Sequence, residues 1–169
     1  MTISMYAASA PRFIHILRNL DAILVKAQAH AAARKIEPGV LLAARLFPDM
    51  MPLTKQVQIA TDHAKGALAR LAGVEVPRFE DNEQSFEELR ARLAKTIAFV
   101  ESFTAGQIDG SEARDIALRV GGHDLAFKGL DYLLGFAVPN FYFHVVTAYN
   151  ILRHNGVDIG KQDYIGDPQ

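Results

Sequence analysis

Residues 53–73 of the chain read LTKQVQIATDHAKGALARLAG, and this stretch has the clearest helical pattern in the protein. Its apolar side chains recur every three or four residues, the spacing that places them along one side of an α-helix. They are Leu53, Val57, Ala60, Ala64, Ala67, Leu68 and Leu71. Pro52 precedes the stretch, and Gly73 follows it where a left-handed glycine commonly ends a helix. The pattern therefore predicts an amphipathic helix between Pro52 and Gly73.

Three other stretches show the same spacing, over residues 13–33, 86–100 and 141–152. The second of them follows Ser85, with Glu88 three residues later, which is the pattern of a capping box at the start of a helix. These three stretches therefore predict three further amphipathic helices.

Pro139 precedes the last of these stretches, and Asn155-Gly156 follows it, so we expect a helix that starts near Pro139 and ends before Gly156. The apolar segment 130–138 leads into it. Pro38 can start a short helical segment after the first helix. The tail, residues 157–169, is rich in Gly and Asp, and we expect it to lie extended on the surface.

The spacing of the apolar residues changes between Asp115 and Phe127, where apolar and other residues alternate on both sides of Gly121-Gly122. Alternation is typical of a half-buried strand, and two glycines supply the positive φ angles of a tight turn. This segment therefore predicts a small β-hairpin between the third and fourth long helices.

Four amphipathic helices must bury their apolar sides against one another, and a bundle is the simple solution. A chain of 169 residues is long enough for one such domain. We expect residues 1–169 to form a single all-α domain, a four-helix bundle with the hairpin in the crossover between helices three and four. Because some connections are long, the topology need not be plain up-down-up-down.

Composition and motifs exclude several classes of function. The chain has no cysteine, which excludes zinc fingers, iron–sulfur clusters and thiol nucleophiles, and its net charge of −1 gives no basic field for nucleic acid. The sequence has no P-loop, no Gly-x-Ser-x-Gly elbow and no His-Glu-x-x-His pair. With no signal-peptide pattern and no apolar run near the ~20 residues of a membrane span, we expect a soluble, cytoplasmic protein.

Two of the six histidines lie where they could carry chemistry. Helical spacing puts His63 at the edge of the apolar side of its helix, and it puts His144 on a largely apolar face together with Asn140. Neutral imidazole binds zinc, nickel, copper or iron, and bundles build metal sites from facing helices. The alternative is that each is a buried histidine satisfied by a hydrogen bond. Of the other four, His15, His30 and His154 are interpreted as structural or solvated residues, and His123 as a turn residue that follows the two glycines of the predicted hairpin.

Several short motifs carry a resemblance to a known family. They are Gln56-Val-Gln-Ile-Ala-Thr-Asp-His-Ala-Lys-Gly66, Pro139-Asn-Phe-Tyr-Phe-His144, Leu152-Arg-His-Asn-Gly156, Arg45-Leu-Phe-Pro-Asp49-Met and Gly129-Leu-Asp-Tyr132. From about Met5 to Gly166 the chain resembles the family DUF1993, a domain of unknown function. That family is similar in fold to the DinB/YfiT superfamily of four-helix bundles.

The resemblance implies a metal site, because DinB-like proteins typically bind a divalent ion through three histidines. His63 corresponds to the histidine of the second helix, and His144 to the second of a pair spaced four apart on the last helix. Asn140 stands at the remaining position. An amide oxygen is a weaker ligand than imidazole for these metals, so water or a carboxylate such as Asp62 or Asp49 would have to add to the site.

Two functions from different classes follow from these observations. The first is a divalent-metal-dependent enzyme, a hydrolase or thiol transferase, that holds zinc, nickel or iron through His63, His144 and Asn140. The second is a metal-free module that binds a small ligand or a second copy of the chain. Under the second, some of the aromatic residues Phe141, Tyr142, Phe143 and Tyr149 are left for a partner subunit, whereas packing against the hairpin and tail is their other explanation.

Overall fold

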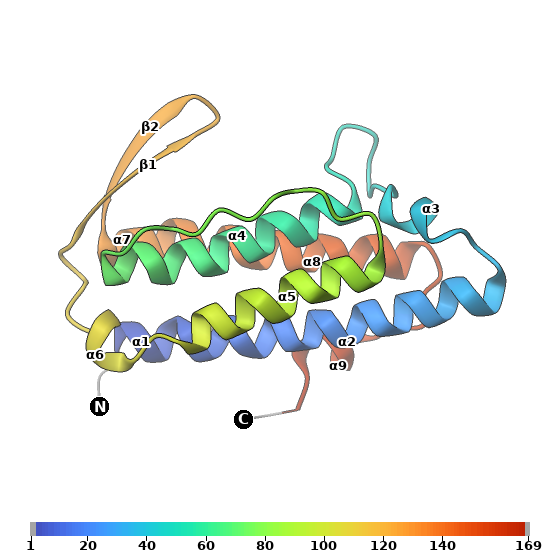
Figure 1. Ribbon diagram of the computed structural model, residues 1–169, viewed down its shortest axis with the longest axis horizontal. Helices are drawn as coiled ribbons and strands as arrows, with labels where there is room; N and C mark the ends of the chain where they lie inside the picture. Colours follow the sequence, from blue (N-terminus) through green and yellow to red (C-terminus); the bar gives the residue numbers. More distant parts are fainter. Residues whose placement is uncertain (1–2, 168–169) are drawn as a thin grey trace.

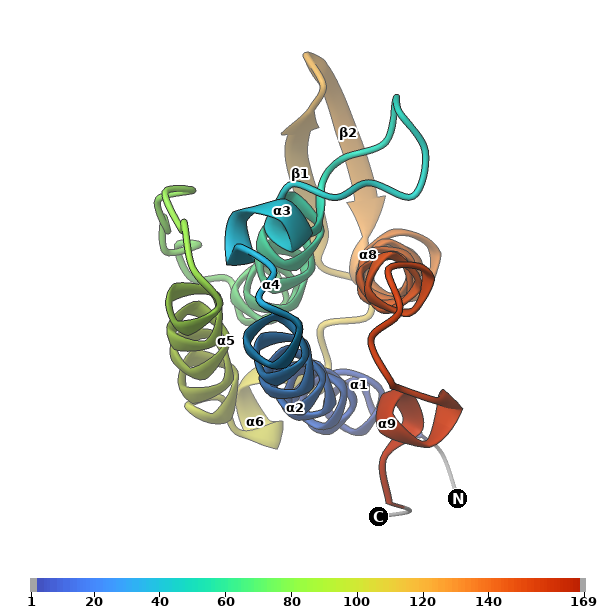
Figure 2. The ribbon, with the colours of Figure 1, turned by 90° about the vertical axis from the view of Figure 1, so that its right-hand side faces the viewer.

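Four long helices form the bundle in the computed structural model, which describes residues 3–167. They are α2 (Ala10–Arg34), α4 (Leu53–Ala72), α5 (Phe86–Glu101) and α8 (Val138–His154). Seen end-on, they follow the order α2, α5, α4, α8 around the bundle (Figure 2). The four-helix bundle predicted from the sequence is confirmed.

The long helices do not alternate in direction along the chain. Helices α2 and α8 run one way, and α4 and α5 both run the other way (Figure 1). Because α4 and α5 are parallel, the segment 73–85 that joins them returns along the length of the bundle. The topology therefore departs from up-down-up-down, but the crossover lies between helices two and three and not, as the sequence predicted, between helices three and four, which are joined at one end of the bundle.

The ends of the long helices follow local sequence signals. Gly73 ends α4 with a φ of 72°, the left-handed conformation expected of it. At the start of α5 the Ser85 hydroxyl accepts a hydrogen bond from the Glu88 backbone N–H at 3.1 Å, which is half of the predicted capping box. The Glu88 carboxylate accepts instead from the backbone N–H of Gln84. Ser85 is thus the N-cap, and the Glu88 carboxylate accepts the hydrogen bond of the backbone N–H one residue before the cap.

Short elements complete the chain. They are α1 (Met5–Ala8), α3 (Pro38–Leu42), α6 (Ala105–Ile108), β1 (Asp115–Val120), β2 (His123–Lys128), α7 (Gly129–Tyr132), the π-helix η1 (Leu133–Ala137) and α9 (Lys161–Ile165). The hairpin prediction is confirmed, since β1 and β2 pair antiparallel in the connection between α5 and α8. Gly121 and Gly122 both have positive φ, 57° and 86°, as a two-residue turn requires.

The helix that carries His144 begins ten residues earlier than the sequence pattern predicted, because α7, η1 and α8 are continuous from Gly129. Pro139 has no N–H to donate and would crowd the carbonyl one turn before it. The π-helical turn absorbs this conflict, with the Val138 N–H bonded to the Leu133 carbonyl five residues back. The Asn140 side chain then donates to the Phe136 carbonyl at 2.7 Å.

The prediction of an extended tail was wrong, because α9 is a short helix that packs along α2 (Figure 2). The imidazole Nε2 of His15 lies 2.6 Å from the Ile165 carbonyl, Asn19 donates to the Tyr164 carbonyl at 3.0 Å, and Lys26 pairs with Asp163 at 2.7 Å. Polar side chains of α2 thus bind the tail, a pairing that periodicity does not reveal. Residues 168–169 of the predicted tail lie outside the described residues.

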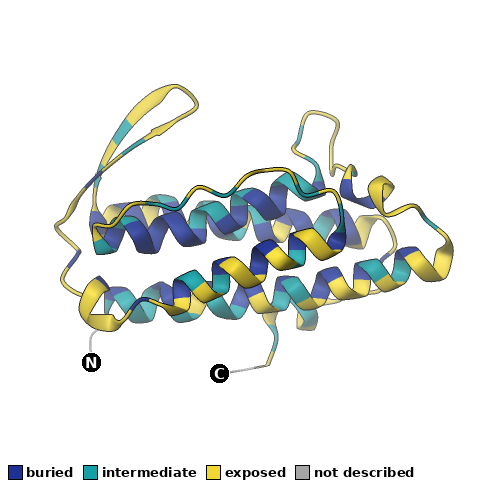
Figure 3. Ribbon diagram, viewed as in Figure 1, coloured by how far each residue is buried: buried dark blue, intermediate teal, exposed yellow. Residues whose placement is uncertain are grey.

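The core lies between the four long helices, and the hairpin projects from it with mostly exposed side chains (Figure 3). Helix α4 packs most extensively on α8. Ala60, Ala64 and Ala67 are completely buried on α4, and such small side chains allow close approach of the helix axes. Across the core, Phe13 and Phe141 meet edge to face with centroids 4.8 Å apart. Within residues 3–167, no helix is long and apolar enough to cross a membrane.

Arg92 of α5 holds the segment 73–85 against the bundle, and its side chain is 2% exposed. The guanidinium lies 2.9 Å from Asp62 of α4, and 3.1 and 3.0 Å from Asp81 and Glu83 of the segment. It also donates to the Thr61 hydroxyl at 2.7 Å. A buried guanidinium needs such partners, so Arg92 joins α4, α5 and the connecting segment at one point.

Replacing Arg92 by alanine should therefore be costly, since it leaves the Glu83 carboxylate, whose side chain is only 9% exposed, without its cation. We expect Arg92→Ala to lower the free energy of unfolding by about 3 kcal/mol, measured by urea denaturation followed by circular dichroism.

Arg90→Ala is the matched control, because Arg90 lies on the same helix and pairs with Asp21 at a 2.8 Å distance while 38% exposed. An exposed pair contributes less than about 1 kcal/mol. Equal losses in the two variants would contradict the role given to Arg92.

Candidate functional site

The bundle brings His63 of α4 and His144 of α8 side by side. Their ring centroids are 5.9 Å apart, and the ring planes are inclined by 14°. The ring of Phe136 in η1 lies 5.7 Å from that of His63. Both histidines are half-buried. The pairing that the sequence predicted for these two residues is thus present in the fold.

A glutamine fixes the orientation of His144. Gln56 is 1% exposed, and its Nε2 donates to the Met51 carbonyl at 2.9 Å. Its Oε1 consequently faces His144, whose Nδ1 lies 2.7 Å away and must be the donor. The imidazole Nε2 of His144 therefore carries a lone pair. Sequence reasoning missed this contact, because spacing within one helix does not show which residue of another helix a side chain meets.

His63 differs from His144 because neither of its ring nitrogens has a hydrogen-bond partner among residues 3–167. Burial and then the neighbouring His144 lower the pKa of His63 to about 4; the Asp62 carboxylate raises it, and the Arg70 guanidinium lowers it by less than Asp62 raises it. Burial also lowers the pKa of His144. Both imidazoles are therefore neutral near pH 7, the form that binds a metal or accepts a hydrogen bond.

The other predicted ligands are placed less directly. Asn140 lies one turn before His144 on α8, and its amide nitrogen is used by the Phe136 carbonyl, which leaves Oδ1 as its free acceptor. Asp62 binds Lys65 and Arg92, so its carboxylate belongs to the ion cluster around α5. Asp49 is exposed in the loop before α4. In the part of the chain that the structure describes, no three His, Cys, Asp or Glu side chains gather as metal ligands.

Aromatic rings extend the site beyond the two histidines. Phe136 lies 6.0 Å from Tyr132 and 5.4 Å from Phe127 of the hairpin, measured between ring centroids. Arg70 of α4 donates to the Tyr132 hydroxyl at 3.0 Å. The hairpin thus supplies a ring to the same apolar wall that borders His63, a placement that strand periodicity alone does not predict.

The remaining four histidines do not belong to this pair and lie on α2, β2 and the last turn of α8. His15 binds the docked tail through the Ile165 carbonyl. His123 is exposed in β2, His154 is exposed in the last turn of α8, and His30 is half-buried on α2. The interpretation of His15, His30 and His154 as structural or solvated residues is consistent with these positions.

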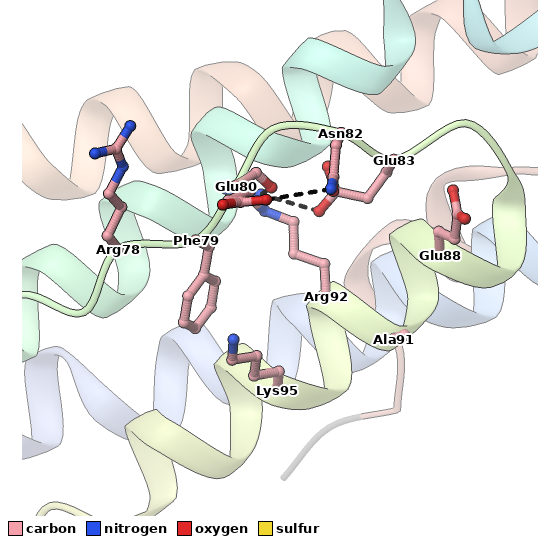
Figure 4. A pocket seen from close by; sticks show the side chains of 9 residues that line it. All are labelled: Arg78, Phe79, Glu80, Asn82, Glu83, Glu88, Ala91, Arg92 and Lys95. Atoms are coloured by element: carbon pink, nitrogen blue, oxygen red, sulfur yellow. Dashed lines mark hydrogen bonds and ion pairs between the residues drawn. The ribbon is translucent and has the colours of Figure 1, made fainter.

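A surface hollow between α5 and the 73–85 segment is part of the scaffold. It holds about 500 Å³ and is lined by residues of the 73–85 segment and of α5, including Phe79, Arg92 and Lys95 (Figure 4). Its central cation, Arg92, already has carboxylate partners, and the Lys95 ammonium lies 4.0 Å from the centre of the Phe79 ring. These contacts close the crossover segment onto the bundle and leave the histidine pair as the candidate site.

The comparisons with known proteins agree with this fold. Residues 5–165 match the family described as "Domain of unknown function (DUF1993)". The crystal structure of a DinB family member protein from Shewanella denitrificans is 40% identical, with a TM-score of 0.86 over 96% of this chain and 92% of that one. None of the curated proteins matches the chain.

The low pKa of His63 predicts a pH-dependent stability. Because its pKa falls from 6.5 to about 4 on folding, the unfolded chain binds this proton more readily. Stability is then full above about pH 6.5 and falls as the pH drops toward 4, by on the order of 3 kcal/mol. Urea denaturation between these pH values, with a chelator present, measures the slope.

The His63→Asn variant should lose most of this slope, whereas His123→Asn, in the exposed hairpin, should keep it. Identical slopes for the protein and its His63→Asn variant would show that His63 titrates normally in the folded state.

Proposed function

The chain belongs to the DUF1993 family, and on that premise we propose that it binds a divalent metal ion between α4 and α8 through His63 and His144. The supporting observation is the pair of neutral imidazoles, one held in a defined tautomer and the other without a partner in residues 3–167. Metal-binding histidines commonly donate their second ring nitrogen to an oxygen acceptor, and the His144–Gln56 contact has this form.

The distance between the rings suits a shared ion. With metal–nitrogen bonds of about 2.0–2.1 Å, two imidazoles on one tetrahedral zinc have centroids about 5 Å apart. The observed separation is 5.9 Å with ring planes inclined by 14°, so His63 would have to turn relative to His144 for the lone pairs of both rings to point at one ion. His63 has no hydrogen bond to break on moving, whereas Gln56 keeps His144 in position.

The donor set fits an open site better than a closed structural one. Two imidazoles, with the Asn140 oxygen as a third ligand or as a group beside them, leave positions for water or a small molecule. Zinc, nickel and iron are the metals that such nitrogen donors favour. A bound ion would supply Lewis-acid polarisation of a ligand or lower the pKa of a bound water.

Hydrolysis or thiol transfer is the reaction type that we propose for such a site. The warrant is likeness of fold to the DinB family, which carries less weight than the site itself. The chain's own contribution would be two neutral imidazoles and a wall of aromatic rings that shields the ligand from water.

The second candidate is a metal-free ligand-binding or homodimeric module. It is favoured by the absence, over residues 3–167, of a third His, Cys, Asp or Glu beside the histidine pair. Of the helix α8 aromatics, Tyr149 packs on Tyr164 of the tail as the packing explanation has it, whereas Phe141 is buried against Phe13 of α2 and not against the hairpin or tail. Phe143 is 57% exposed and is the one of the four open to a partner. The homodimer stays a prediction.

Metal content tests the main proposal directly. We expect the protein, purified without tag or chelator and incubated with zinc, nickel or iron, to hold near-stoichiometric metal by elemental analysis. The His63→Ala, His144→Ala double variant should hold almost none, since it lacks both imidazole donors.

The control is the His123→Ala, His154→Ala double variant, which removes two exposed histidines from other parts of the chain. Equal, low metal content in all three proteins would contradict the metal proposal and favour the metal-free module.

The role of Gln56 gives a separate prediction. Gln56→Leu removes the acceptor for His144 Nδ1, and loss of such a partner weakens metal binding by about 10–100-fold. Gln56→Glu should keep or raise the affinity, because a carboxylate accepts the same hydrogen bond. A competition titration with a coloured chelator measures both values.

Gln58→Leu is the matched control, since Gln58 is buried two residues away on α4 but donates to Glu83 of the crossover segment at 2.7 Å. If Gln58→Leu and Gln56→Leu weaken metal binding equally, the effect is one of helix stability and not of His144 orientation.

A further inference from the structure

Gly66 lies in the middle of α4, where glycine is the least favourable residue apart from proline. The structure gives a reason for it. A Cβ built on Gly66 would collide with Nη1 of Arg70 and lie 3.4 Å from its Cζ, and the three nearest atoms outside the helix backbone all belong to the Arg70 guanidinium. The missing side chain is therefore the space in which the Arg70 guanidinium rests.

This arrangement moves the positive charge toward the histidines. Arg70 is seven residues from His63, about 10 Å along the helix axis, whereas Gly66 is three residues away, about 4.5 Å. By folding back over Gly66, the guanidinium lies about one turn from His63.

The Arg70 guanidinium has few partners for its five N–H donors within residues 3–167. Its hydrogen bond to the Tyr132 hydroxyl is neutral, and within residues 3–167 no carboxylate pairs with it. Arg92, on the other side of α4, has three carboxylates within 3.1 Å. The fold thus neutralises one inward-facing arginine of this region and leaves the other with free donors beside the histidine pair.

The surroundings of Arg70 are otherwise apolar. Its guanidinium carbon lies 5.9 Å from the centre of the Tyr132 ring, and the rings of Phe136 and Phe127 continue from Tyr132. Phe136 in turn borders His63. A cation, an aromatic wall and two neutral imidazoles therefore lie in sequence along the contact between α4 and the helix formed by α7, η1 and α8.

We propose that Arg70 binds the oxyanion group of a small organic ligand, a carboxylate or a phosphate, whose apolar part packs on Phe136 and whose far end reaches His63 and His144. The planar fork of arginine pairs with either oxyanion through two parallel hydrogen bonds. This inference deepens the proposed function, since it takes the histidine pair as the other end of the same site.

Calorimetric titration with benzoate, phenyl phosphate and benzamide tests the proposal on chelator-treated and on metal-loaded protein. We expect one or both anions to bind at millimolar concentration or below, and benzamide, which has the same ring without the charge, at least about 10-fold more weakly. The tighter of the two anions identifies the oxyanion. Arg70→Gln should weaken its binding at least about 10-fold, and Arg34→Gln, at an exposed residue near the end of α2, should not change it.

Gly66→Ala is the sharper variant, because it keeps Arg70 and displaces only its flexible end. Alanine favours a helix over glycine, so the melting temperature should equal or exceed that of the unchanged protein. Anion affinity should still fall several-fold, since the guanidinium loses its resting place. Unchanged affinity in both Arg70→Gln and Gly66→Ala, equal binding of benzamide, or no binding of any of the three probes would overturn the proposal.

The two proposals fail differently in this experiment. Anion binding that needs Arg70 in metal-free protein supports the arginine site even if the histidines hold no metal. Anion binding that needs added metal and survives Arg70→Gln places the anion on the metal, which supports the proposed function and overturns the inference about Arg70.

Discussion

The constraint on which this structure depends is the nearly complete enclosure of α4. The helix packs against α8 and α5, and the 73–85 segment runs along it. Even its polar residues are therefore buried, namely Gln56, Gln58, Thr61 and Lys65. Buried polar groups need partners, and each of these four has one. His63 is half-buried in the same helix and has no hydrogen-bond partner from residues 3–167, and its ring nitrogens stay open to solvent, since the buried unpartnered side-chain atom of these residues is the Ser111 hydroxyl.

The buried polar groups on the two sides of α4 differ in charge. Toward α5, the fold uses full charges, with Arg92 surrounded by Asp62, Asp81 and Glu83. This cluster is satisfied internally, so it fixes the crossover segment and offers little to a ligand. Toward α8, the groups are neutral imidazoles and an amide, which keep their binding capacity while costing little to bury.

The sequence predicts the architecture well because burial imposes a period. The apolar spacing of residues 53–71, and the glycines at 73, 121 and 122, follow from local geometry that one element decides by itself. Spacing also placed His63 and His144 at the inner sides of their helices, but only the resemblance to DinB-like proteins implied that they belong to one site. Contacts between elements were not: the Gln56–His144 hydrogen bond depends on the relative rotation of two helices, and the docking of the tail on α2 depends on polar side chains without a pattern. The π-helical turn before Pro139 was missed because a proline normally indicates a start and not an interruption.

Charge balance connects the histidine pair to Arg70. A divalent ion between His63 and His144 would lie close to a guanidinium that no carboxylate neutralises within residues 3–167, and like charges at such distances repel. Two neutral imidazoles contribute no negative charge to offset this repulsion. An anionic ligand removes it, because one oxyanion faces Arg70 while the rest of the ligand completes the coordination of the ion. Metal and anion would therefore bind more tightly together than either does alone, and an equilibrium coupling of this kind is reciprocal. In the two proposals taken together, one negatively charged ligand would pair with the charge of Arg70 and complete the neutral histidine site.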